Sequence, residues 1–252
     1  MDQHALTMTA PAPLRLAMWS GPRNISTAMM RSWGNRPDTA VVDEPFYAFY
    51  LNKTGADHPA INEVIAAGET DPHNIIRHMT GAIPAGKRIF YQKQMTHHLL
   101  PAVDRDWLRD VTNCFLIRDP ADVIASYTKK NHEPSLDDLG FVQQEEIFDF
   151  VCREITATPP IVDAADVLRD PRRTLQMLCD AVSVEFTDAM LSWPAGRRAT
   201  DGIWAKYWYA EVEQSTGFQP FREHHAEVPR QLRDIHERGC AVYDQLHALR
   251  LH

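Results

Sequence analysis

The feature that most constrains this chain is a buried segment that leads through a small polar loop into a helix. Residues 14–19 (LRLAMW) are apolar except for Arg15 and have the pattern of a short buried strand. Residues 20–27 (SGPRNIST) are small and polar, and residues 28–33 (AMMRSW) form a helical run that Gly34 and Asn35 end. A strand that enters a helix through such a loop predicts an α/β protein with ligand contacts at the carboxyl edge of its sheet.

The loop has the chemistry of a phosphate site. Backbone N–H groups of such a loop and of the following helix N-terminus point at a bound anion. Arg23 adds a charged fork, and Ser26 and Thr27 each add a hydroxyl. A magnesium–ATP loop needs a Lys before its final Ser or Thr, but Ile25 precedes Ser26 and no Lys occurs from position 1 to 52. We therefore expect an anion site that is not a magnesium–ATP site; the alternative is an ordinary turn capped by Ser26.

Acidic residues follow the second predicted strand. Residues 39–42 (TAVV) form a short apolar strand that runs into Asp43, Glu44 and Pro45. Pro45 keeps Glu44 out of helical geometry, and the ends of such strands are where α/β sheets bind ligands. We expect the turn to present the Glu44 carboxylate as a functional group. The alternative is that both acids cap the helix expected over 46–51.

A cation and two imidazoles follow the third predicted strand, residues 88–92 (RIFYQ). Lys93 comes directly after it, and His97 and His98 lie one helical turn further on. A charge and a titratable group at this spacing can serve one ligand. The alternative is a surface Lys with two solvated His side chains.

The clearest buried strand is 111–117 (VTNCFLI), which ends in Arg118 and Asp119. Asp119 followed by Pro is a typical helix start, so Ser126 lies two turns into a helix, about 10 Å along it from Arg118. A phosphate and its ribose span that gap. An Arg after a buried strand is costly unless it meets an anion; the alternative partners are Asp119 and Asp122.

Strands alternate with helices from residue 14 to residue 183, which predicts a parallel sheet with right-handed crossovers. We predict an α/β fold of three layers, with a central parallel sheet of about five strands, the last over 161–163, flanked by helices. Further helices are expected over 61–67, 72–79, about 138–156, about 171–182 and 230–249. The predicted domains are a disordered tail, 1–13, without a signal peptide, and a single domain, 14–252.

Composition narrows the classes of protein. A net charge of −8 gives no overall pull toward nucleic acid or a membrane, although a local basic pocket is compatible with it. The four cysteines lack metal or redox spacing, which indicates reduced thiols of a cytoplasmic protein. We expect no metal site, because the pairs His97–His98 and His224–His225 have no further ligand at helical spacing.

The C-terminal third, 190–252, is expected to form a nucleotide-covering loop and a docked final helix. Its segment 203–209 (IWAKYWY) is densely aromatic. Trp204 and Lys206 can cover a purine and its phosphates by stacking and charge. The alternatives are packing within the domain and a homodimer contact.

Two separated motifs resemble the sulfotransferase family. Residues 21–27 (GPRNIST) are similar to the family's first loop, which binds the 5′-phosphosulfate end of 3′-phosphoadenosine-5′-phosphosulfate (PAPS). Residues 116–127 (LIRDPADVIASY) are similar to the second, in which an Arg and a Ser eight residues later hold the 3′-phosphate. The resemblance implies a P-loop NTPase-like fold and donor contacts from Gly21, Pro22, Arg23, Asn24, Ile25, Ser26, Thr27, Arg118 and Ser126. The first motif departs from the family at Asn24 and Ile25, where Ser-Gly is usual, so we expect a differently shaped loop there.

The resemblance implies transfer of a sulfuryl group from PAPS to a hydroxyl or amine of a small-molecule acceptor, leaving adenosine 3′,5′-bisphosphate (PAP). It implies chemistry without a metal, and the net charge of −8 predicts no nucleic-acid or membrane partner. Arg23 and Lys93 would stabilise the transferring group. Family members use a general base after the second strand or near the third, which indicates Glu44 first and His97 or His98 next. The rivals are a kinase or NTPase-like protein and a non-catalytic nucleotide-binding relative; the acceptor pocket is expected within 45–87 and 134–158.

Overall fold

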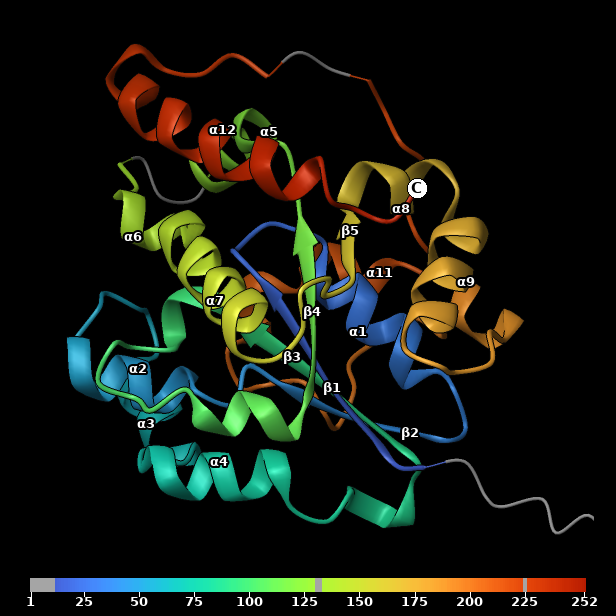
Figure 1. Cartoon of the computed structure of the whole chain (residues 1–252). Coiled ribbons are helices and arrows are strands. Elements are labelled where there is room, and N and C mark those ends of the chain that lie inside the picture. Colours follow the sequence, from blue (N-terminus) through green and yellow to red (C-terminus); the bar gives the residue numbers. More distant parts are fainter. Residues whose placement is uncertain (1–11, 130–132, 224–225) are drawn as a thin grey trace, which may run out of the picture.

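Five parallel strands form one sheet in the order β2-β3-β1-β4-β5 (Figure 1). The structure, a computed structural model, describes residues 12–129, 133–223 and 226–252. Most of the predicted tail and the pair His224–His225 therefore lie outside the described residues. The strands are β1 (Leu14–Ser20), β2 (Thr39–Asp43), β3 (Ile89–Met95), β4 (Thr112–Ile117) and β5 (Ile161–Asp163). The predicted α/β class and the five-stranded parallel sheet are confirmed.

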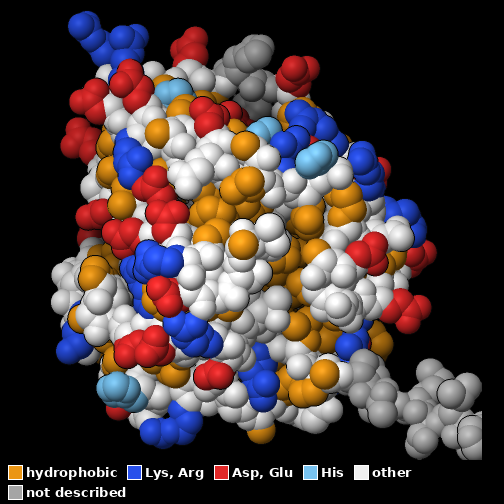
Figure 2. All heavy atoms as spheres, viewed as in Figure 1, with side chains coloured by type: hydrophobic (Ala, Val, Ile, Leu, Met, Phe, Trp, Pro, Cys, Tyr) orange, Lys and Arg blue, Asp and Glu red, His pale blue; other side chains and the backbone are white. Residues whose placement is uncertain are grey.

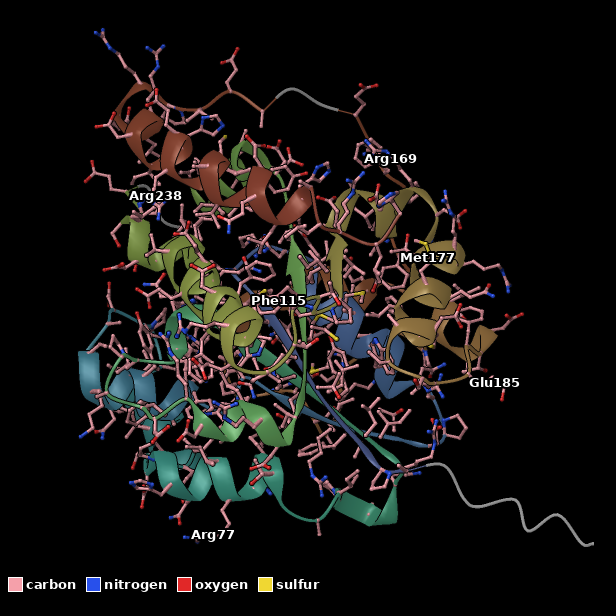
Figure 3. The ribbon with its side chains drawn as sticks, in the orientation of Figure 1. Arg77, Phe115, Arg169, Met177, Glu185 and Arg238 are labelled. Atoms are coloured by element: carbon pink, nitrogen blue, oxygen red, sulfur yellow. The ribbon has the colours of Figure 1, made fainter. Side chains whose placement is uncertain are left out.

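Helices cover both faces of the sheet because its strands are apolar on both sides. Successive side chains of β1 alternate between two cores: Leu16 and Met18 pack into one, and Ala17 and Trp19 into the other. The first core lies under α1 (Ser26–Gly34), α8 (Ala164–Arg169) and α9 (Pro171–Ala181). The second lies under α4 (Pro72–Thr80), α7 (Phe141–Glu154) and α12 (Arg233–His247), with Phe115 deep inside it (Figure 3).

The remaining elements are short and lie mostly around the carboxyl edge of the sheet. The α-helices are α2 (Tyr47–Thr54), α3 (Ile61–Ala67), α5 (Pro120–Tyr127), α6 (Leu136–Leu139), α10 (Ala205–Trp208) and α11 (Ala210–Gln214). The 3-10 helices are η1 (Pro84–Gly86), η2 (Thr96–His98), η3 (Asp106–Asp110), η4 (Asp188–Leu191) and η5 (Arg230–Leu232). Acidic and basic side chains intermingle on the face that Figure 2 shows, as expected for a chain without a strong overall charge field.

The structure departs from the predicted elements at β3, at α6 and α7, and at α8. Strand β3 continues to Met95, so Lys93 lies inside the strand and not after it. The long helix predicted over 138–156 is two helices, α6 and α7, separated by Gly140 in the left-handed conformation (φ 70°). Helix α8 was not predicted; it starts directly after β5, where the Asp163 side chain accepts the N–H of Ala165.

Three observations bear on the compositional predictions. The cysteines Cys114, Cys152, Cys179 and Cys240 are all free thiols. No group of three metal-ligating side chains gathers within the described ranges. In the same ranges, no helix is long and apolar enough to cross a bilayer.

Candidate functional site

The loop after β1 leaves the start of α1 open. Helix α1 begins at Ser26, its N-cap residue is Ile25, and no side chain caps it by a hydrogen bond. The loop is therefore not the Ser26-capped turn considered as an alternative. The first N–H groups of a helix have no partner within it, so these groups, with the positive end of the helix dipole, remain available to an anion.

Backbone strain is concentrated in this loop. Arg23 (φ 64°) and Ile25 (φ 55°) both adopt left-handed conformations. Ile25 thus has the conformation that glycine takes without strain, although a β-branched residue was expected to restrict it. Gly21 is required for a different reason, since a Cβ there would lie 2.5 Å from the carbonyl oxygen of Leu139.

The two predicted phosphate loops contact each other, because they follow the neighbouring strands β1 and β4. The Arg118 guanidinium donates to the carbonyl oxygen of Arg23 at 2.7 Å, and Arg23 Nε donates to Ser126 Oγ at 2.9 Å. Asp122, one of the alternative partners, also lies 3.5 Å from Arg118. The structure therefore brings Arg23, Arg118 and Ser126 together.

The electrostatics of this pair of loops favour an anion. Burial lowers the pKa of the Arg23 guanidinium; the nearby Glu211 carboxylate opposes this shift and the Arg118 charge adds to it. Two guanidinium groups held close together and half-buried repel each other. A bound phosphate would relieve that repulsion and take up their free N–H donors.

Asp43, Glu44 and Lys93 form a buried cluster at the tips of β2 and β3. The Lys93 ammonium lies 2.9 Å from Asp43 Oδ1 and 2.5 Å from Glu44 Oε1. It also donates to the Tyr209 hydroxyl at 2.6 Å, and that hydroxyl donates to Asp43 at 2.8 Å. Lys93 is therefore not the surface residue considered as an alternative. Neither acid caps α2, whose N-cap residue Phe46 has no side-chain partner.

Opposing effects set the protonation of this cluster. Burial alone would lower the pKa of Lys93, but the Asp43 and Glu44 carboxylates raise it well above the usual value. Burial raises the pKa of Glu44, and the Lys93 charge only partly reverses this shift. Glu44 is thus a stronger proton acceptor than an ordinary carboxylate. Its backbone is strained (φ 46°), as is typical of functional sites.

Of the two neighbouring imidazoles, His98 is buried and His97 is half-buried, so the solvated alternative is wrong. His98 stacks against the rings of Tyr47 and Tyr50, at centroid distances of 4.5 and 4.8 Å, with Nδ1 3.9 Å from Glu44 Oε2. Burial lowers the pKa of His97 to about 4 and that of His98 well below its usual value. The structure places His98 next to Glu44, whereas the ring contacts of His97 are with Tyr50 and His98.

The described contacts of Trp204 and Lys206 are with residues outside the two predicted phosphate loops. Trp204 packs edge-on against Tyr47 at a centroid distance of 5.0 Å. Lys206 is exposed, where its ammonium pairs with Glu63 at 2.6 Å. The residue of the aromatic segment that reaches the buried cluster is Tyr209, which sequence reasoning missed. Its only signal was membership of that segment, because nothing in the local pattern says which aromatic side chain turns inward.

Comparison with known proteins now identifies the architecture. The family model of the sulfotransferase domain matches residues 14–248. The chain belongs to the sulfotransferase family. The sulfotransferase domain of the Synechococcus PCC 7002 olefin synthase superposes on 98% of both chains, with a TM-score of 0.51 and 16% identity. That of the curacin biosynthetic pathway superposes on 94% of this chain and 99% of its own, with a TM-score of 0.53 and 14% identity. These likenesses show a shared fold.

The sulfotransferase domain also has curated relatives in Arabidopsis thaliana. Branched-chain-amino-acid aminotransferase-like proteins 1 and 2 are 34% and 33% identical to it over 229 residues. The match covers 90% of this chain and 40% of each relative. The chain therefore spans about two fifths of the length of these relatives.

Proposed function

We propose that this sulfotransferase domain binds PAPS and transfers its sulfuryl group to a hydroxyl or amine of a small-molecule acceptor. The observation that carries the proposal is the contact between the two loops, through Arg118 with the Arg23 carbonyl and Arg23 with Ser126. Two cations and a hydroxyl lie beside an uncapped helix N-terminus, an arrangement suited to a nucleotide with phosphates at both ends.

The residues of the chain have distinct roles in the proposed transfer. The acceptor oxygen or nitrogen attacks sulfur and forms a bond to it, while the bond from sulfur to the bridging oxygen of the 5′-phosphate breaks. PAP leaves with that electron pair, and Arg23 with the first N–H groups of α1 stabilises the charge on its phosphate. The acceptor proton passes to the carboxylate of Glu44, whose raised pKa suits a general base.

Calorimetric titration with PAP tests the donor site, beside a titration with ATP and Mg²⁺. We expect PAP to bind and Arg118→Ala to weaken it by about 10- to 100-fold, the value of a charge-assisted contact. Arg172→Ala is the matched control, because Arg172 pairs with Asp188 at the exposed end of α9. A protein that binds ATP and Mg²⁺ but not PAP would instead be a kinase or hydrolase.

Glu44→Gln separates binding from chemistry. This variant should keep PAP binding and lose transfer, measured as single-turnover consumption of labelled PAPS with a panel of acceptors. In the unchanged protein the transfer rate should fall on acidification, because Glu44 can accept a proton only as the carboxylate. The midpoint of this fall should lie above the usual carboxyl range, because burial raises the pKa of Glu44. Unchanged transfer by Glu44→Gln would move the base to His97 or His98.

A specific observation favours a second candidate, a non-catalytic nucleotide-binding relative. Asp43, Glu44 and Tyr209 already surround the Lys93 ammonium, so its charge is not offered to a transferring group. The names of the curated relatives also refer to an aminotransferase. This candidate would be supported if the protein binds PAP tightly but does not consume PAPS. The Arg118→Ala variant should then have lost the binding of PAP.

A further inference from the structure

A cavity of about 520 Å³ lies beside Glu44, between the end of β2, helices α2, α3 and α4, and residues 201–204. Its volume is within the range of small-molecule sites. Apolar side chains form much of its wall, among them Val42, Ala48, Val64, Ile75, Met79 and Trp204. No residue of the two phosphate loops is among the described lining residues, so the cavity is distinct from the donor site.

The charged groups of the cavity wall are acidic. Asp43, Glu44, Glu69 and Asp201 line it, and none of the described lining residues is Lys or Arg. Two cations stand behind this wall. Lys93 pairs with the first two acids, and Arg31 pairs with Asp201 at 2.6 Å. Four carboxylates thus face two cations, which leaves an excess of negative charge at the cavity.

Glu69 carries part of this excess. Its carboxylate accepts the backbone N–H groups of Asp71 and Thr70 at 2.9 and 2.8 Å, and the Asn74 side chain at 3.1 Å. These hydrogen bonds hold the pKa of Glu69 below its usual range, and the bond from the Asp71 backbone has the largest effect. The side chain is therefore ionised at neutral pH, at the exposed end of α3.

We propose that this cavity binds an acceptor with an apolar body and a basic nitrogen, a primary amine or amino alcohol, and disfavours a carboxylate of the same shape. The apolar body is removed from water against the aliphatic and indole walls. The ammonium meets the uncompensated carboxylates, whereas an anion is repelled by them. This preference rests on the proposed transfer, in which Glu44 is the base. In an amino alcohol the ammonium anchors the acceptor and the hydroxyl attacks sulfur, passing its proton to Glu44. A primary amine attacks only in its neutral form, after its ammonium has lost one proton to water, and passes a second proton to Glu44.

Titration without any donor tests the preference. Three probes share a phenyl ring and are close in size: 2-phenylethylamine, 2-phenylethanol and phenylacetate. At neutral pH the amine should bind at least about tenfold more tightly than the carboxylate, with the alcohol between them. Equal binding of amine and carboxylate, or no binding of the amine, overturns the proposal. PAP is absent from this titration, so its result does not depend on the titration of the donor site. Failure of the acceptor proposal can therefore be distinguished from failure of the proposed PAPS binding.

Variants of α3 locate the binding. Ala66 and Ala67 are both exposed on α3, but Ala67 lines the cavity and Ala66 does not. Ala67→Trp should weaken amine binding at least about tenfold by filling the space, while Ala66→Trp should leave it unchanged. Glu69→Gln should reduce the preference for amine over carboxylate several-fold and leave binding of the alcohol unchanged. An identical effect of both Trp variants would place the amine outside the cavity.

Discussion

At the scale of single residues, the strained positions mark the site. Five described residues other than glycine have positive φ, and three of them are Arg23, Ile25 and Glu44. Such conformations cost free energy and persist where the surrounding structure enforces them. Arg23 and Ile25 shape the phosphate loop, and Glu44 presents a carboxylate at the tip of β2. Ile25 replaces the family's usual glycine, but its backbone is still left-handed, so the replacement changes only the side chain at this position.

Ile25 provides a test of this backbone strain. Ile25 packs partly against the core under α1, so Ile25→Ala and Ile25→Gly both lose that packing. The difference between their free energies of unfolding therefore reports the strain of the left-handed backbone. We expect Ile25→Gly to be more stable than Ile25→Ala by about 1 kcal/mol, measured by urea denaturation. Ala66→Gly, in the regular helix α3, should show the opposite order, with glycine less stable by about 0.5–1 kcal/mol. A more stable Ile25→Ala variant would contradict left-handed strain.

At the scale of elements, one glycine decides how the second core meets the phosphate loop. Gly140 separates α6 from α7, and its carbonyl oxygen accepts the Thr96 hydroxyl at 2.9 Å. A Cβ at this position would lie 2.5 Å from Thr96 Oγ1 and 3.5 Å from the Cα of Gly21. The break thus allows the chain after α6 to approach both η2 and the loop after β1. A continuous helix over 138–156, as the periodicity predicted, could not do this.

Gly140→Ala should therefore be more destabilising than an ordinary glycine substitution. Gly55, which ends α2, has a similar φ of 64° but no atom within 4 Å of an added Cβ. Gly55→Ala should lower the free energy of unfolding by about 1 kcal/mol through the left-handed backbone alone. Gly140→Ala adds a steric clash and should lower it by at least about 2 kcal/mol. Equal losses for the two variants in urea denaturation would mean that the neighbours of Gly140 move aside easily.

At the scale of the whole molecule, buried hydrogen bonds connect the C-terminal third to the sheet, and a buried ion pair connects it to α1. Tyr209 joins Asp43 and Lys93, and Arg31 of α1 pairs with Asp201. The segment predicted to cover the nucleotide thus forms one wall of the acidic cavity and completes the cluster at β2 and β3. A buried pair that loses one partner leaves an uncompensated charge.

Lys93→Met should therefore destabilise the chain strongly. Two carboxylates and the Tyr209 hydroxyl would lose their shared cation, with an expected loss of about 3 kcal/mol or more in the free energy of unfolding. Lys206→Met is the matched control, because Lys206 pairs with Glu63 on the surface and its loss should change stability little. Comparable urea midpoints for the two variants would show that the buried cluster adds no stability.

The sequence by itself determined the fold class, the strands and the positions of the two loops that we propose to bind phosphate. Local signals are sufficient there: apolar runs indicate buried strands, and Asp119, which accepts the N–H groups of Ala121 and Asp122, marked the start of α5 as predicted. Only the tertiary structure decided which side chains meet. The pairing of β2 with β3 places Lys93 opposite Asp43, and a loop more than a hundred residues later supplies Tyr209. Such partners depend on burial and long-range packing, which no local pattern encodes.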